Sequence, residues 1–227
     1  SLADRQQIAQ LKTLTNPTQD ISVDCLILTA QLTGPLTHAQ LPLVEKARTR
    51  ILTGQNLPDE CQVLVDLISP AMGDEYATRR FALALDAGNE ALAARLITKL
   101  PSAQQTEART IVSFMQAPDA RISRVLRSQD GASSADAVSY GLKTLASDNL
   151  PKAISAAQQL LQTYNCSTIQ KNRFAGVIGV KLAGNRDVAA YEWFKLTDPN
   201  ETDNKVREWR IASALWVSPT VNSWPSI

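Results

Sequence analysis

Histidine and cysteine, which often serve as catalytic groups or zinc ligands, are rare in the 227-residue chain. His38 is the only histidine. No cysteine or serine nucleophile lies at motif spacing from it, so we expect a surface histidine. The three cysteines, Cys25, Cys61 and Cys166, contain no C-x-x-C pair. A structural zinc site usually takes four Cys or His ligands, so we do not expect one. Two of the cysteines could form a disulfide in an oxidising compartment, and buried free thiols are the alternative.

Carboxylates and glycines also lack a catalytic pattern. A two-carboxylate glycosidase needs its acids to face each other across a cleft, which spacing alone cannot establish. Gly176 and Gly179 lie within a helical pattern rather than in a phosphate-binding loop, and we expect them to allow close helix packing. The glutamates fall on helical segments among basic neighbours, where a solvated face is the default: Glu45, Glu75, Glu90, Glu107 and Glu208. The sequence therefore predicts no catalytic, cofactor-binding or metal-binding residues.

Two groups of side chains could contact a glycan. An arginine stripe on one helical face could meet carboxylates, and tryptophans near the C-terminus could stack on sugars. For each group the structural interpretation is stronger, because an exposed basic stripe needs no ligand and tryptophans at helical spacing are usually core. The residues are Arg121, Arg124 and Arg127, and Trp193, Trp209, Trp216 and Trp224.

The composition favours packed helices. Hydrophobic residues make up 44% of the chain and aromatic residues only 5%, while Ala and Leu, both strong helix formers, are plentiful. The net charge is +1 with both signs interspersed, so the surface has no strong attraction for nucleic acid or anionic lipid. No apolar run is long enough to span a membrane.

Apolar periodicity and breaker residues predict about a dozen helices of roughly 10–17 residues joined by short turns. Helix pairs recur at roughly 30–35 residues, the range of helical-repeat solenoids, without a tetratricopeptide or ankyrin consensus. One pair cannot bury its own apolar stripe, so neighbouring pairs must stack. We therefore expect an all-α superhelix of stacked helix pairs, forming a single domain over residues 1–227. Predicted helices include Ala3 to Leu14, Pro42 to Thr53, Asn89 to Leu100, Ser102 to Gln116, Asp119 to Arg127, Pro151 to Tyr164, Ser167 to Ala183 and Arg186 to Leu196.

Several motifs follow one another in a recognisable order. A helix with a cysteine leads to a glycine turn, then to a Leu-Pro-x-x-Cys helix start, then to a helix ending in Ala-Gly-Asn and one ending in Leu-Pro. The segments are Asp24 to Gly34, Ala47 to Gly54, Leu57-Pro-Asp-Glu-Cys61, Arg80 to Asn89 and Leu92 to Pro101. A Trp-Arg helix follows at Val206 to Leu215, with Trp224 close behind; Ala212 stands where a second arginine is common. This order resembles the superhelical, non-catalytic domain of the soluble lytic murein transglycosylases.

The resemblance implies a periplasmic protein with a disulfide between Cys25 and Cys61. That bond would close a loop of roughly 36 residues, which the chain-entropy model values at about 3–4 kcal/mol. Cys166 would then be left over as a small buried apolar residue.

The resemblance also implies where the chemistry lies. Family members cleave between N-acetylmuramic acid and N-acetylglucosamine to a 1,6-anhydro product, with one glutamate in a separate, C-terminal goose-lysozyme-like domain. This sequence has no Glu-Ser dipeptide and no Gly-Leu-Met-Gln segment. Ser113-Phe-Met-Gln116 is better interpreted as the end of an amphipathic helix. We therefore expect a non-catalytic part of a longer protein, with peptidoglycan and its own catalytic domain as partners.

Two other interpretations remain at this stage. The chain begins with Ser1-Leu2 rather than Met, so we expect a processed protein or an excised piece. A stand-alone helical-repeat module that binds other proteins is the alternative function. A self-contained enzyme has no motif to support it.

Overall fold

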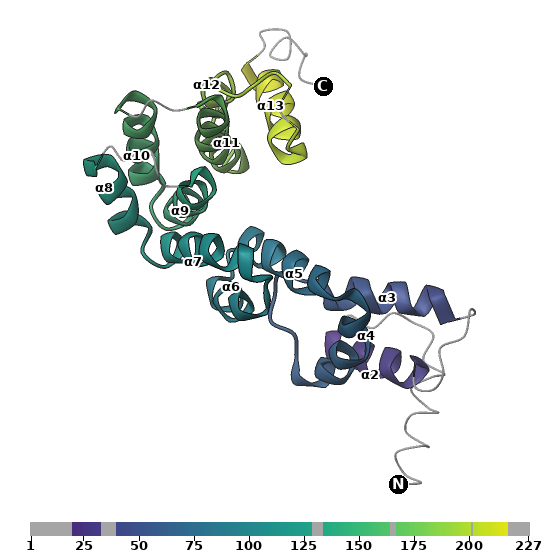
Figure 1. The fold of residues 1–227 in the computed structure, drawn as a ribbon. Helices are drawn as coiled ribbons and strands as arrows, with labels where there is room; N and C mark the ends of the chain where they lie inside the picture. The colour runs from purple at the N-terminus through teal and green to yellow at the C-terminus, as the bar shows by residue number, and fades with distance from the viewer. Residues whose placement is uncertain (1–19, 33–39, 129–133, 164–166, 201, 218–227) are drawn as a thin grey trace, which may run out of the picture. The chain divides into compact units, whose positions relative to one another are not determined.

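The computed structural model describes residues 20–32, 40–128, 134–163, 167–200 and 202–217. Regular structure in these ranges is helical throughout (Figure 1). The predicted all-α fold of successively packed helices is therefore confirmed. The helix expected from Ala3 to Leu14 lies outside the described residues. No described helix combines the length and apolar character that crossing a membrane requires.

The chain divides into two compact units, residues 1–105 and 106–227, and the boundary falls inside helix α7. The first unit begins with three helices that pack on one another. Their bounds are α2 Ile21–Leu32, α3 Leu41–Ile51 and α4 Gln62–Met72, with a short 3-10 turn, η2, at Asp59–Cys61. The remaining elements are α5 Asp74–Asp86, α6 Glu90–Leu96, η3 Ile97–Lys99 and the start of α7 Ser102–Gln116.

Buried leucine and isoleucine side chains at helical spacing hold α2, α3 and α4 together. Leu28 and Leu32 of α2, Ile51 of α3 and Leu64 of α4 are almost fully buried in one cluster. Full burial of such a side chain stabilises the fold by about 1.5–3 kcal/mol relative to leaving it exposed. The apolar periodicity that predicted these helices is the face that forms this cluster.

The second unit continues with helices that pack mainly on their neighbours in the chain. Helix α9 packs on α8, α10 and α11, and α11 packs on α12 and α13. The bounds are α8 Pro118–Ser128, α9 Ala135–Asp148, α10 Leu150–Thr163, α11 Thr168–Gly184, α12 Ala190–Phe194 and α13 Asn204–Val217.

Local capping residues explain why several helices begin where the sequence predicts. The side chain of Asn89 accepts a hydrogen bond from the backbone N–H of Leu92 at the start of α6. Ser167 and Gln170 form a complete capping box at the start of α11. These side chains satisfy backbone donors that have no partner within the helix.

The helix expected from Arg186 to Leu196 is shorter in the structure. Helix α12 covers only Ala190–Phe194, because Arg186 adopts a positive φ of 57° that ends α11 and starts a turn. The Asp187 carboxylate then accepts a hydrogen bond of 2.9 Å from the backbone N–H of Ala189, which holds the turn. Such a left-handed residue is uncommon outside glycine and had no signal in the sequence.

Candidate functional site

The five glutamates singled out in the sequence do not gather into one site. Glu45 and Glu75 both pair with Arg48, at 3.2 and 3.3 Å, on the surface of the first unit. Glu90, Glu107 and Glu208 are exposed on three different helices. Among the described residues, no cluster of three or more His, Cys, Asp or Glu could hold a metal ion. His38 lies outside the described residues.

The segment Ser113 to Gln116 forms the last turn of α7. Phe114 and Met115 are buried there, and Gln116 is exposed. This is the amphipathic helix end that the sequence predicts.

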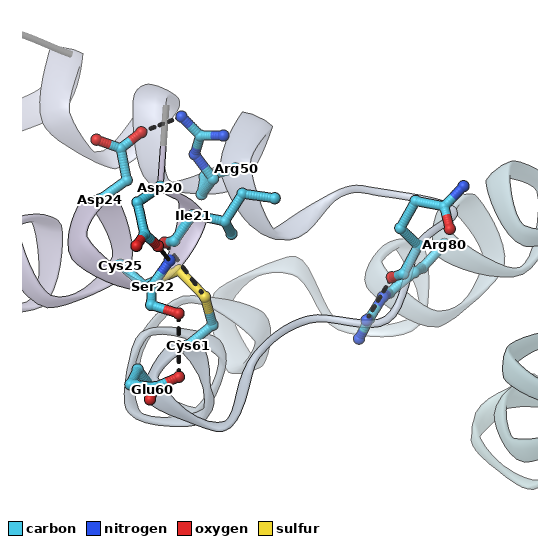
Figure 2. Close-up of a disulfide and its surroundings, with 10 residues drawn as sticks. Asp20, Ile21, Ser22, Asp24, Cys25, Arg50, Glu60, Cys61 and Arg80 are labelled. Atoms are coloured by element: carbon cyan, nitrogen blue, oxygen red, sulfur yellow. Dashed lines mark hydrogen bonds and ion pairs between the residues drawn. A yellow bond between two sulfur atoms is a disulfide. The ribbon is translucent and has the colours of Figure 1, made fainter. Parts of the chain in front are cut away.

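Cys25 and Cys61 form a disulfide, the pair that the family resemblance implies (Figure 2). Their Cα atoms lie 5.0 Å apart, and both residues are fully buried. The bond joins α2 to the short turn η2 that precedes α4. Ser22 also donates a hydrogen bond of 3.2 Å to Glu60 across the same junction. Cys166 lies outside the described residues.

An ion pair involves the residue next to Cys25: Arg50 of α3 donates to the carboxylate of Asp24 of α2 (Figure 2). The Asp24 side chain is only 4% exposed, whereas that of Arg50 is 32% exposed. A charge removed from water in this way needs a charged partner to offset its desolvation. The pair fixes α2 against α3 independently of the disulfide.

The turn between α3 and α4 is anchored to α5 and α6 by side chains of the Arg80 to Asn89 segment, whose contacts the sequence does not reveal. Buried Arg80 donates to the hydroxyl of Tyr76 at 2.7 Å and to the carbonyl of Gln55 at 3.4 Å. Asn89 donates to the carbonyl of Gly54 at 3.2 Å. A Cβ on Gly54 would lie 2.1 Å from the carbonyl oxygen of Leu83, so only glycine fits this close approach. The glycine turn of the family motif is therefore a structural junction.

The Trp-Arg helix motif has an equally structural basis. Arg210 donates to the carbonyls of Asp198 and Pro199, at 2.7 and 2.9 Å, and so holds the turn before α13. Val206 packs against Gly176 of α11. These contacts explain the motif without a ligand.

The tryptophans do not form one aromatic surface. Trp193 is 9% exposed and belongs to the core of the second unit. Trp209 and Trp216 of α13 are half-buried and meet edge to face, with ring centroids 6.2 Å apart. This agrees with the structural interpretation for Trp193 in particular. Trp224 lies outside the described residues.

The arginine stripe lies on the outer side of α8. Arg124 and Arg127 are exposed and Arg121 is half-buried, whereas Ile122 and Val125 point into the core. No carboxylate among the described residues pairs with these arginines. The stripe is an exposed basic face of one helix, and nothing in its geometry requires a ligand.

A hollow of about 300 Å³ lies between α10 and α12 in the second unit. We call it the α10–α12 hollow. Its lining consists of Gln158, Leu161, Gln162, Glu192, Trp193 and Leu196. Of these residues only Trp193 belongs to a group of side chains that the sequence suggests could contact a glycan. The rest carry no motif, because the hollow depends on how α10 and α12 each pack on α11.

The charges at the rim of the α10–α12 hollow neutralise each other. Lys195 lies 2.5 Å from the carboxylate of Glu192 and 5.4 Å from the ring centroid of Tyr191. Gln158 and Gln162 are exposed, and neither amide has a hydrogen-bond partner among the described residues. The hollow thus combines an apolar floor, free amides and an internally paired charge.

Together, these features define an all-helical module whose sequence motifs maintain helix junctions. The chain is similar in structure to the lytic transglycosylase Slt of Pseudomonas aeruginosa in an inactive mutant form. The TM-score is 0.61 and the identity 29%, over 94% of this chain and 35% of that one. The 70 kDa soluble lytic transglycosylase of Escherichia coli matches with a TM-score of 0.53 and 18% identity, over 97% of this chain and 33% of that one. A 70-kDa soluble lytic transglycosylase in complex with bulgecin A matches with a TM-score of 0.52 and 18% identity, over 94% of this chain and 32% of that one.

No protein-family model and no curated protein sequence matches the chain. The chain spans about one third of the length of the solved structures that it resembles. The resemblance to the soluble lytic transglycosylases that the motifs predicted is confirmed by these structures.

Proposed function

We propose that this chain is the non-catalytic helical domain of a longer soluble lytic transglycosylase. The observation that carries the proposal is the match to the Pseudomonas aeruginosa enzyme, at 29% identity over 94% of this chain but only 35% of that one. The sequence contains neither the Glu-Ser dipeptide nor the Gly-Leu-Met-Gln segment that the resemblance assigns to the catalytic domain. We place that domain in the part of the protein beyond this chain.

The intact protein would cleave peptidoglycan between N-acetylmuramic acid and N-acetylglucosamine, with release of 1,6-anhydro products. In this proposal the helical domain frames the catalytic domain and helps to hold glycan strands. The disulfide, the Asp24–Arg50 ion pair and the anchored turn between α3 and α4 support this role, because together they make a stiff frame. A stiff frame can position a second domain at low entropic cost.

We also propose that the protein works in the periplasm. The Cys25–Cys61 disulfide supports an oxidising compartment, because structural disulfides persist there and are rare in the cytosol of most organisms. Cell fractionation tests this directly, and recovery of the protein with the reduced cytosolic pool would contradict it.

The reading frame past Ile227 tests the proposal at the level of the gene. We expect a downstream Glu-Ser helix followed by a Gly-Leu-Met-Gln type segment. A stop codon directly after Ile227 would contradict the proposal and favour a stand-alone helical-repeat module.

Sedimentation with purified peptidoglycan tests the role in holding strands. We expect this chain to sediment with insoluble peptidoglycan and to remain in solution without it. A chain that stays in the supernatant at every peptidoglycan concentration would remove the strand-holding role.

A further inference from the structure

We propose that the α10–α12 hollow binds one uncharged sugar ring of a glycan strand. The proposal rests on the proposed function for the kind of polymer that reaches the site. The chemistry of the ligand itself comes from the floor, the rim, the charge and the size of the hollow.

The floor of the hollow is apolar and partly open to water. Leu161 is half-buried, Leu196 is 53% exposed, and Trp193 contributes the small part of its surface that its core packing leaves uncovered. A leucine this exposed gains stability when a ligand covers it. The C–H face of a pyranose ring is a suitable cover, because it is flat and apolar while its edge carries hydroxyl groups.

The rim supplies hydrogen-bonding groups that the protein leaves unused. Gln158 and Gln162 are four residues apart on α10, so they lie on the same side of the helix. Each side-chain amide offers two N–H donors and one carbonyl acceptor. Neither amide has a partner in the described part of the chain, so both are available to the hydroxyl and acetamido groups of a sugar.

The paired charges select for a neutral ligand. Lys195 neutralises Glu192 at 2.5 Å, so the hollow has no net charge to attract a phosphate, a carboxylate or an amine. The arginines of α8 are not part of the lining.

The size of the hollow limits the ligand to a single ring. Its volume of about 300 Å³ is at the lower end of the range of roughly 300–1,000 Å³ typical of small-molecule sites. One N-acetylhexosamine ring would occupy it, and the neighbouring rings of a strand would lie in solvent. We expect weak binding, with a dissociation constant on the order of 1 mM, because one ring in an open site makes few contacts.

Titration of the isotope-labelled chain with chitotetraose, followed by nuclear magnetic resonance, tests the site. We expect the indole N–H signal of Trp193 and the side-chain amide signals of Gln158 and Gln162 to shift together with one binding curve. Joint replacement by Gln158→Ala and Gln162→Ala should weaken binding about tenfold, because two hydrogen bonds are lost. Both residues are exposed, so the backbone spectrum should show that the fold is retained.

Gln159→Ala is the matched control. Gln159 is exposed on the same helix but is not part of the lining, so its replacement should change the affinity less than about twofold. The proposal is overturned if chitotetraose leaves the Trp193 signal unmoved, or if the double variant and the control bind equally well. The proposal is also overturned if nuclear Overhauser contacts show that another segment of the protein, and not the sugar, occupies the hollow.

Failure of this proposal can be told apart from failure of the proposed function. If the double variant still sediments with peptidoglycan as well as the unaltered chain, the hollow is not the site, but the chain still holds strands. If neither protein sediments while the Trp193 signal still shifts with chitotetraose, the sugar site stands and the strand-holding role fails.

Discussion

Asp24 is a buried acid that forms an ion pair with an arginine of the next helix. Its side chain is 4% exposed, and its ionic partner Arg50 belongs to the next helix. Arg48, on the same helix as Arg50, has the same side-chain exposure of 32%, but its partners Glu45 and Glu75 are exposed. The two arginines therefore differ mainly in the burial of the carboxylates that they contact.

We predict that Arg50→Ala lowers the free energy of unfolding by about 2–4 kcal/mol, because the ion pair with Asp24 is lost while Asp24 stays buried. The control Arg48→Ala should cost less than about 1 kcal/mol, because ion pairs at the surface are worth little. Urea unfolding measures both. Equal losses for the two variants would show that burial of Asp24 has no energetic consequence.

The disulfide gives a second prediction at this scale. Removing the bond with the paired substitutions Cys25→Ala and Cys61→Ala should lower the free energy of unfolding by about 3–4 kcal/mol, from the 36-residue separation of the two cysteines. Before reduction, the protein should have one thiol that can be alkylated, and after reduction three. Mass spectrometry counts them, and three alkylated thiols in the non-reduced protein would rule out the bond.

At the scale of elements, α11 is the helix on which α12 and α13 pack, and its glycines allow this. A Cβ on Gly179 would lie 2.8 Å from the ring of Phe194 in α12, and one on Gly176 would lie 3.2 Å from Val206 in α13. A Cβ on Gly184, at the end of the same helix, would meet nothing within 4 Å. The sequence-based expectation that Gly176 and Gly179 allow close packing is confirmed.

We therefore predict opposite effects at two glycines of one helix. Gly179→Ala should destabilise the protein by about 1–3 kcal/mol, because the Phe194 ring is buried and must shift. Gly184→Ala should be neutral or stabilise by up to about 1 kcal/mol, because alanine favours the helix and has room. Thermal unfolding of the two variants tests this, and a loss of stability at Gly184 equal to that at Gly179 would contradict the packing argument.

The starts of several helices were predictable, because the capping residues that mark them act on nearby backbone groups. Asn89 and Ser167 each cap the helix that the sequence predicts to start there, because a cap needs only the next few backbone N–H groups. The α10–α12 hollow was not predictable, since its two walls meet only through their packing on α11. The ion pair between Arg50 and Asp24 was also not predictable from the sequence, because its two residues lie on different helices.

Across the whole molecule, the motifs that carry the resemblance to the soluble lytic transglycosylases are structural. The glycine turn, the disulfide and the Trp-Arg helix each hold helices together. Their presence in the sequence is therefore explained by helix packing. The chain matches only about one third of the enzymes that it resembles, so their activity belongs to the proposal for the longer protein.

The products released from purified peptidoglycan test whether this chain is the non-catalytic part of a lytic transglycosylase. The chain from Ser1 to Ile227 should release nothing, whereas the longer protein that includes the sequence beyond Ile227 should release fragments ending in 1,6-anhydro-N-acetylmuramic acid. Mass spectrometry distinguishes these fragments from hydrolysis products by the missing water. Anhydro products from the Ser1 to Ile227 chain alone, or none from the longer protein, would show that the proposed division of roles is wrong.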